Sequence, residues 1–296
     1  MRRAPLVLVL WLILAAAGSS CAPTGGSTAP IDDDTSFAGP FAVAITGYDD
    51  HAMEPFLTRD GQYLLFNDRN APADSTDLHI AARVDDSTFA YVGPLDSLNG
   101  ATLDAVPTGA TDGTLVFVSL RAYDSTFSTL FTSTLSGATA SAPSRLASVS
   151  TGGGGLLDFD VDLSADGQQL IVARGRFTGA ALPVEADLRL YRREGAGFTP
   201  ATDGAALLAA LNSSALEFAP AMTATGLELC YTRLVPGREP VLMIARRAIV
   251  TEAWGTPRRI RGPTGLVEAG TWSPDGRSLY FHALVNGRYV IRRLMR

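Results

Sequence analysis

Short stretches in which apolar and polar residues alternate fill most of the chain, and dipeptides that favour turns separate them. Alternation with a period of two is typical of β-strands that bury one face. A turn dipeptide followed by such a stretch occurs five times, at intervals of 50 to 59 residues. The copies begin at Asp60-Gly61, Asp112-Gly113, Asp166-Gly167, Thr225-Gly226 and Asp275-Gly276. This repetition indicates a chain built from similar units of β-structure.

Each unit contains enough alternating segments for four short strands. The turn dipeptide joins the first two strands as a hairpin, which Asp-Gly favours as a two-residue turn. A third apolar run follows the hairpin, at 77–84, 127–134, 186–194, 240–247 and 288–294. Weaker fourth segments occur at 197–200 and 253–257. Four strands in each unit of about 50 residues predict the blades of a β-propeller.

The last unit ends at Arg296 without a fourth segment, whereas Phe41–Thr46 precedes the first unit as an unassigned strand. Pairing these two ends removes exposed sheet edges. We therefore predict an all-β fold, a five-bladed β-propeller with four-stranded antiparallel blades. The N-terminal strand Phe41–Thr46 is expected to complete the last blade, within a single domain over residues 39–296.

The repeats carry a family resemblance. The Trp-Ser-Pro-Asp-Gly sequence at 272–276 and the Phe-Asn-Asp-Arg sequence at 66–69 resemble the repeats of TolB-type, WD-like bacterial β-propellers. The resemblance implies the fold more than an activity. It does not imply membership of a Tol-Pal complex, because the Tol-associated member has an additional N-terminal domain that we do not find here.

The first twenty residues have the features of an export signal. Arg2 and Arg3 precede an apolar run over 6–17, followed by small residues and Cys21. As a helix this run spans about 18 Å, less than the ~30 Å of a bilayer core. Cys21 resembles the lipidated cysteine of bacterial lipoproteins, although Gly18 stands where an aliphatic residue is usual. The alternative is an ordinary cleaved signal.

We therefore expect a signal peptide over 1–20 and a flexible tether over 21–38 that starts from a lipidated Cys21. The tether is rich in Pro, Thr, Gly, Ser and Asp, and too poor in apolar residues to order itself. By resemblance to lipoprotein sorting, Ala22 favours the outer membrane of the cell envelope. Cys230, within an apolar run, is expected to be buried and unreactive.

Charge excludes several functions. All 24 basic residues are Arg, so lysine Schiff-base chemistry and a P-loop lysine are excluded. The formal net charge of −6 argues against nucleic acid as a partner.

The predicted channel rim carries the candidate binding residues. In a propeller the first strand of each blade lines the central channel, and an acid stands six to eight residues before every turn. These acids are Glu54, Asp104, Asp158 (with Asp160), Glu217 and Glu268. Together they predict a negative mouth for a divalent cation such as calcium, or for a cationic or polyhydroxylated ligand. His51, close to Glu54, is the histidine expected at this mouth.

A structural role for the same acids is the other interpretation. Arginines follow the second strands at Arg69, Arg121, Arg174, Arg176 and Arg233. Bidentate pairing with these arginines, between adjacent blades, would neutralise the acids and fix the register of the blades.

The sequence contains no catalytic motif that we recognise, and we assign no catalytic residue from it. The leading hypothesis is a monomeric, envelope-anchored propeller that binds a protein, peptide or glycan without catalysis. It needs no cofactor, and calcium bound in the channel would fit this hypothesis as well as its alternative. The alternative is a five-bladed glycoside hydrolase that uses two rim carboxylates. Such an enzyme would differ by having an acid pair that arginine does not neutralise.

Overall fold

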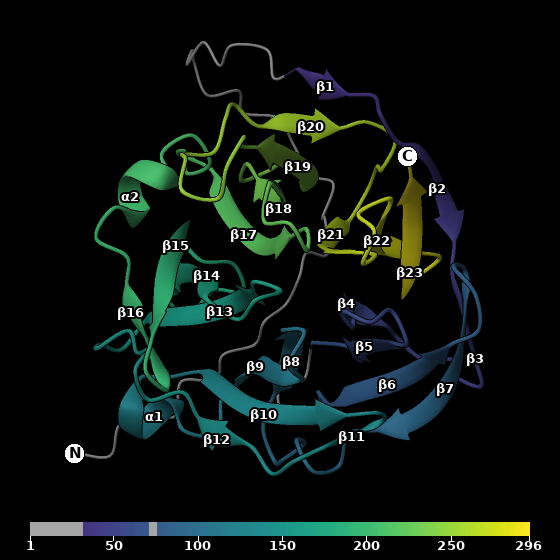
Figure 1. Cartoon of the computed structure of the whole chain (residues 1–296), viewed down its shortest axis with the longest axis horizontal. Coiled ribbons are helices and arrows are strands. Elements are labelled where there is room, and N and C mark those ends of the chain that lie inside the picture. Colours follow the sequence, from purple (N-terminus) through teal and green to yellow (C-terminus); the bar gives the residue numbers. More distant parts are fainter. Residues whose placement is uncertain (1–31, 71–75) are drawn as a thin grey trace.

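The computed structural model describes residues 32–70 and 76–296. The predicted signal peptide, Cys21 and most of the predicted tether lie outside these residues. The described chain is almost entirely β-structure, with strands arranged in five groups around a common axis (Figure 1). We call each group a blade. No helix of the described residues is long and apolar enough to cross a membrane.

Each blade takes its strands from one sequence repeat. Blade 1 contains β4 (Met53–Leu57), β5 (Tyr63–Asn67), β6 (Leu78–Arg83) and β7 (Thr88–Pro94), and blade 2 contains β8 (Asp104–Gly109), β9 (Thr114–Ser119), β10 (Leu130–Ser136), β11 (Thr139–Ala140) and β12 (Ser144–Arg145). Blade 3 contains β13 (Leu156–Leu163), β14 (Gln169–Arg176), β15 (Glu185–Glu194) and β16 (Gly197–Pro200), and blade 4 contains β17 (Leu216–Met222), β18 (Glu228–Leu234), β19 (Val241–Arg246) and β20 (Arg258–Ile260). Blade 5 contains β21 (Val267–Trp272), β22 (Ser278–Val285) and β23 (Arg288–Met295). Blades 3 and 4 are joined by one parallel bridge, between Ala186 and Leu216.

The first strand of every blade is innermost. These strands contact one another in cyclic order, from β4 to β8, β13, β17 and β21 and back to β4 (Figure 1). The hydrophobic core lies between neighbouring sheets, as where Val116 and Val118 of blade 2 pack with Val161 and Val172 of blade 3. The repeats therefore pack their apolar faces on each other and leave the ends of the inner strands around the axis.

The N-terminal segment joins three different blades. Strand β2 (Ala38–Ala42) pairs antiparallel with β23 and is the fourth strand of blade 5. Strand β3 (Ala44–Thr46) instead adds to blade 1, parallel to β7. The predicted assignment of all of Phe41–Thr46 to the last blade is therefore wrong for its second half. The chain crosses between blades at Val43, because its alternating pattern serves either edge equally well.

The end of the predicted tether also forms structure. Strand β1 (Asp33–Asp34) pairs parallel with β20, and Asp34 forms an ion pair with Arg246. The fourth strand of blade 4 is β20, although the pattern predicted 253–257. In that predicted segment Trp254 is buried against the Arg247 guanidinium, so packing explains its apolar character.

The five hairpins form as predicted, but their turns are longer than two residues. Between β4 and β5 the Gly61 N–H donates to the Thr58 carbonyl at 2.7 Å, and Asp60 accepts from the Gln62 N–H at 3.0 Å. The turn is thus a five-residue loop over 58–62, in which Gly61 takes a positive φ of 72°. Besides its strands, the described chain contains two short helices, α1 (Tyr123–Thr126) and α2 (Gly204–Leu207).

Candidate functional site

A β-bulge interrupts each innermost strand close to the channel axis. In four blades the bulge contains a non-glycine residue with φ between 48° and 55°, and a Pro or Gly follows it: Glu54, Val106, Ala219 and Ala269. Blade 3 has a one-residue bulge between Asp158 and Asp160. Bulges bend the strand and redirect its side chains, and they decide here which acids face the channel.

The backbone N–H of each positive-φ residue donates to a side chain of another blade. Glu54 donates to His282 Nδ1 at 3.1 Å, and Ala219 donates to Asp160 Oδ2 at 3.1 Å. The Val106 and Ala269 N–H groups donate in the same way to Asn67 and Thr232. These bonds satisfy donors that the bulges remove from the ladder, and they hold the blades together around the axis.

Three of the five predicted rim acids are neutralised by arginine. Asp158 accepts a bidentate pair of bonds from Arg174, at 2.7 and 2.9 Å. Glu217 bonds Arg233 at 2.8 Å, and Asp104 bonds Arg121 at 2.5 Å. All three acids are fully buried. The predicted arginine pairing is therefore present at Asp104, Asp158 and Glu217, but its expected place between adjacent blades is wrong. Each pair lies within one blade, because the acid and its arginine come from the two arms of one hairpin.

Glu268 and Glu54 differ from these three acids by their place in the ladder. Asp158 and Glu217 lie opposite Arg174 and Arg233, and the corresponding residue of blade 5 is Val267 opposite Ala283. Glu268 stands one residue further on, and Glu54 lies inside its bulge. A shift of one residue turns a side chain to the opposite face of a strand. No arginine of the described residues forms an ion pair with either glutamate.

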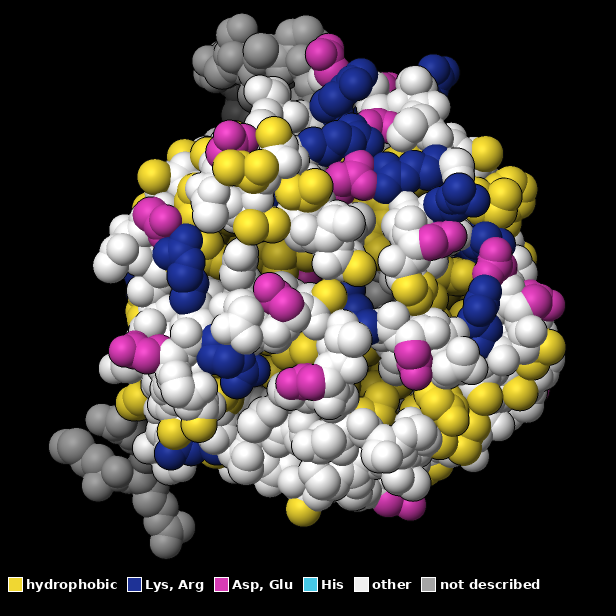
Figure 2. All heavy atoms as spheres, viewed as in Figure 1, with side chains coloured by type: hydrophobic (Ala, Val, Ile, Leu, Met, Phe, Trp, Pro, Cys, Tyr) yellow, Lys and Arg dark blue, Asp and Glu magenta, His cyan; other side chains and the backbone are white. Residues whose placement is uncertain are grey.

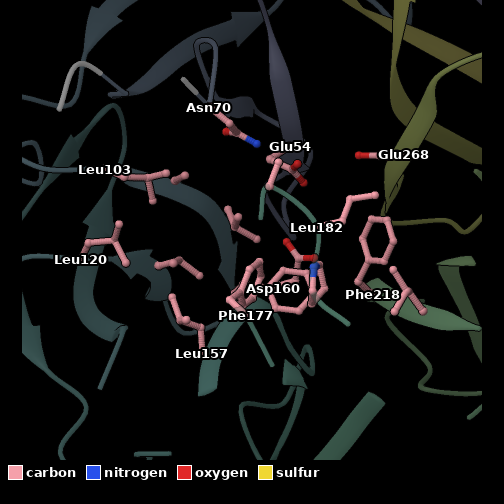
Figure 3. A pocket seen from close by; sticks show the side chains of 17 residues that line it. Glu54, Asn70, Leu103, Leu120, Leu157, Asp160, Phe177, Leu182, Phe218 and Glu268 are labelled. Atoms are coloured by element: carbon pink, nitrogen blue, oxygen red, sulfur yellow. The ribbon is translucent and has the colours of Figure 1, made fainter. Parts of the chain in front are cut away.

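Glu54, Glu268 and Asp160 meet at one pocket. They come from the innermost strands of three blades, β4, β21 and β13, and their exposed fractions are only 6%, 3% and 5%. The carboxyl groups of Glu54 and Glu268 are directed toward each other, with Asp160 beside them (Figure 3). One oxygen of each glutamate and one ring nitrogen of His282 lie within 4.8 Å of one another. Both Glu268 oxygens and His282 Nε2 have no hydrogen-bond partner among the described residues.

The three acids hold protons more strongly than ordinary carboxyls. Burial raises the pKa of Glu268 to about 8. Burial is also the main cause that raises the pKa of Glu54 to about 7, against the opposing effect of His282. Burial and then the charge of Glu54 raise the pKa of Asp160 well above its usual range. At neutral pH the pocket therefore contains at least one protonated carboxyl.

The histidine at this pocket was not singled out by the sequence. His282 is fully buried, and its Nδ1 accepts a hydrogen bond from the backbone N–H of Glu54. A neutral imidazole that accepts at Nδ1 carries its proton on Nε2. Nε2 lies 3.7 Å from Glu268 and faces it as a donor. A metal ion at Nε2 would have to displace this proton, so the trio of Glu54, Glu268 and His282 does not fit a metal ion well in this arrangement.

The other predicted and unpredicted residues lie elsewhere. His51 does not line the pocket; it packs against Tyr289 and accepts the Tyr289 N–H at Nδ1. Arg59, which the sequence did not indicate, crosses the far end of the channel. It donates to Gly109 of blade 2 at 2.9 Å and to Leu163 of blade 3 at 2.7 Å. As ligands, the rim acids and His51 remain predictions.

The face in Figure 2 carries charged side chains of both signs. Basic side chains gather in its upper right part, with acidic side chains among them, and charges are scattered over the rest of this face. Several pair across strands, such as Arg259 with Asp33. The pocket of Glu54, Asp160 and Glu268 is therefore the candidate functional site.

Comparisons with known proteins give the fold but no family. No protein family model matches the sequence, and no curated protein matches it either. A solved structure described as "Glycoside hydrolase" superposes with a TM-score of 0.60 at 11% identity, covering 89% of this chain and 91% of that chain. The catalytic domain of Coprinopsis cinerea GH62 alpha-L-arabinofuranosidase gives a TM-score of 0.56 at 12% identity, covering 88% and 96%.

TolB from Acinetobacter baumannii is also similar, with a TM-score of 0.48 and 14% identity over 83% of this chain. The chain spans 55% of the length of that TolB chain. The predicted TolB-type family stays a prediction, because no family model and no curated protein matches the sequence. By its fold, this chain is similar to five-bladed β-propellers, several of which are glycoside hydrolases.

Proposed function

We propose that this protein hydrolyses glycosidic bonds, with Glu268 and Glu54 as the working carboxyl groups. The observation that carries the proposal is the convergence of Glu54, Asp160 and Glu268 in one pocket, free of arginine, on a fold shared with glycoside hydrolases. A glycoside hydrolase needs an acid pair that arginine does not neutralise, whereas a purely structural rim does not. The Glu54–Glu268 pair therefore favours a glycoside hydrolase over a non-catalytic scaffold.

Glycoside hydrolysis needs one protonated carboxyl to protonate the leaving oxygen and one ionised carboxyl to stabilise or attack the sugar carbon. The pKa of about 8 keeps Glu268 protonated at neutral pH, which suits the proton donor. The lower pKa of Glu54, about 7, makes it the first of the two to ionise. Asp160 lies close to both glutamates, and its carboxyl influences which of them carries the negative charge. His282 Nε2–H faces Glu268 and stabilises it once it has given up its proton.

The spacing of the pair predicts the stereochemistry. The nearest oxygens of Glu54 and Glu268 lie no more than 4.8 Å apart, which is shorter than the separation of about 5 to 5.5 Å in retaining enzymes and much shorter than that in inverting enzymes. Inverting enzymes need roughly 6.5 to 9.5 Å, to leave room for water. We therefore expect the product to keep the anomeric configuration of the substrate, which proton NMR of the first-formed sugar measures.

The experiment is a screen of purified protein against aryl glycosides of pentoses and hexoses and against polysaccharides, with Glu268→Gln in parallel. We expect hydrolysis of at least one substrate, and a fall in kcat/KM of about 10²- to 10⁴-fold in the variant. Glu252→Gln is the matched control, because it is the same substitution at the exposed surface and outside the pocket. Absence of hydrolysis on the whole panel, or full activity in Glu268→Gln, refutes the proposal.

A non-catalytic binding propeller is the second candidate, for a protein, peptide or glycan partner. The observation that favours it is the apolar lining of the pocket, which offers few groups to sugar hydroxyls. In that case ligands bind at the pocket with measurable affinity, and none is turned over.

We further propose that the body is tethered to the cell envelope through a lipidated Cys21, at the outer membrane. The support is the sequence of residues 1–22. Metabolic labelling with a radioactive fatty acid, and fractionation of the envelope, test it. We expect label in the wild type and none in Cys21→Ser, and label in both proteins would contradict the anchor.

A further inference from the structure

The pocket that holds the three acids has walls of unusual composition. Apart from Asn70 and the acids, its lining is aliphatic or aromatic, including Leu103, Leu120, Leu157, Phe177, Leu182 and Phe218 (Figure 3). The ring of Phe159 also lines it and packs on Phe177 at 5.5 Å and on Phe218 at 6.0 Å between centroids. The acids thus stand at one side of an apolar chamber with a cluster of phenyl rings.

No positively charged side chain of the described lining compensates the acids when they ionise, and only dipoles such as the Ala219 N–H at Asp160 stand beside them. The described lining contains no Lys or Arg, and both Glu268 oxygens are buried without a hydrogen-bond partner. A buried carboxylate without a partner is costly, whereas a positive group beside it restores the balance. Phenyl faces also attract cations. The missing partner is therefore a positive group that carries apolar surface.

We propose that this chamber binds an organic ammonium compound with an apolar body, its nitrogen between Glu54, Glu268 and Asp160 and its body against the phenyl cluster. This proposal is independent of hydrolysis, since it requires binding alone. The ammonium donates to the unpartnered Glu268 oxygens, and the hydrocarbon part replaces water on the walls. Leu182, on the β14–β15 connection, covers the body of the ligand from one side.

An organic cation suits the chamber better than a bare metal ion. Hard cations keep several oxygen ligands or waters, and the leucine and phenylalanine walls provide none. His282 Nδ1 already accepts the Glu54 N–H, which places the imidazole proton at the nitrogen that faces Glu268. Metal binding is accordingly the competing outcome of the test.

The test is calorimetric titration of the protein at pH 8 with three probes: 2-phenylethylamine, its neutral counterpart 2-phenylethanol, and methylamine. We expect 2-phenylethylamine to bind at least tenfold more tightly than either of the others, because only it combines charge with an apolar body. Equal affinity for the amine and the alcohol, or no binding of the amine, overturns the proposal. Binding of calcium or manganese chloride that excludes the amine overturns it in favour of a metal site.

Two variants locate the bound probe. Glu268→Gln removes the charge beside the nitrogen and is expected to weaken amine binding tenfold or more, whereas Glu252→Gln at the exposed surface leaves it unchanged. Leu182 lies on the β14–β15 connection and packs against the core from outside the strands, and Leu182→Ser is expected to weaken the binding of 2-phenylethylamine more than that of methylamine. Amine binding without hydrolysis of any glycoside supports the inference while refuting the proposed enzyme, and hydrolysis without amine binding does the reverse.

Discussion

Two residues that the sequence treats alike, Asp158 and Glu268, have opposite roles because they differ by one step in the strand ladder. Asp158 lies opposite Arg174 and is neutralised by it. Glu268 lies opposite His282, seven residues before its turn dipeptide where Asp158 lies eight before, and is left without a hydrogen bond. At the scale of residues, register decides between a structural acid and a site acid.

The first prediction concerns the arginine that neutralises Asp158. Arg174→Met leaves a fully buried carboxylate without its bidentate partner, and we expect a loss of about 3 to 5 kcal/mol in the free energy of unfolding. Urea denaturation measures it. The control is Arg176→Met on the same strand, because the Arg176–Glu185 pair is about half exposed and is expected to contribute less than about 1 kcal/mol. Equal losses in the two variants would contradict a structural role for the buried pair.

The second prediction concerns pH. Glu268 and Glu54 have raised pKa values, about 8 and about 7. At pH values above the usual pKa range of carboxyl groups, the folded state therefore binds more protons than the unfolded state. Stability therefore falls as pH rises toward 8. Burial lowers the pKa of His282, which acts in the opposite direction but only below about pH 6.5. Burial also raises the pKa of Asp160, which adds to the loss.

Between pH 6.5 and 8 we expect the wild type to lose on the order of 2 kcal/mol through Glu268. Thermal unfolding across this range measures the loss. Glu268→Gln should flatten the profile, since a neutral amide has no proton to lose, whereas Glu252→Gln at the exposed surface should not. A wild-type midpoint that does not change between these pH values would argue against buried, proton-holding acids.

At the scale of elements, the bulges and turns give each inner strand its form. The Asp of the turn is a turn former, as expected; in the last hairpin Asp275 accepts from the Ser273 hydroxyl and the Arg277 N–H. The bulges are not visible in the alternating pattern, because an extra residue looks like an ordinary change of phase. A Pro or Gly inside an inner strand, as at Pro55 and Gly270, is the signal that could have located them.

The third prediction concerns the bulge of blade 5. A Cβ at Gly270 would lie 3.0 Å from Cys230 Sγ and 3.0 Å from a Leu279 methyl carbon, so the inner strand passes directly against its neighbours. We expect Gly270→Ala to destabilise the fold by about 1 to 3 kcal/mol, and Cys230→Ala in the same chain to recover part of this loss. Gly153→Ala, which meets nothing within 4 Å, is the control for thermal unfolding. A neutral Gly270→Ala would mean that the bulge has room to relax.

At the scale of the whole molecule, the N-terminal segment connects blades that are distant in sequence. Strand β2 covers the edge of β23, and β1 and β3 add to blades 4 and 1. Figure 1 shows the three strands following the outer margin of the molecule, past the C-terminus. Long-range pairing of this kind protects edges that would otherwise bind other strands.

The fourth prediction follows from this arrangement. Removing residues before Ala44 deletes β1 and β2, exposes β23, and breaks the Asp34–Arg246 ion pair. We expect a lower unfolding midpoint and association that increases with protein concentration, measured by calorimetry and sedimentation velocity. A chain that starts at Asp32 is the control and should behave as the full body does. A monomeric, equally stable truncated protein would show that β2 is dispensable.

The repeat, the five hairpins, the innermost position of the acidic strands and the burial of Cys230 could be predicted along the chain, because they depend on local periodicity and turn chemistry. Which acids escape pairing with arginine could not be predicted, because it depends on how the five blades pack. Glu54 of the first repeat, Asp160 of the third and Glu268 of the last meet only when the blades surround one axis. The site also depends on the bulges, on the histidine of β22 and on apolar walls that come from different repeats. Contacts across the channel cannot be predicted from the pattern along a single strand.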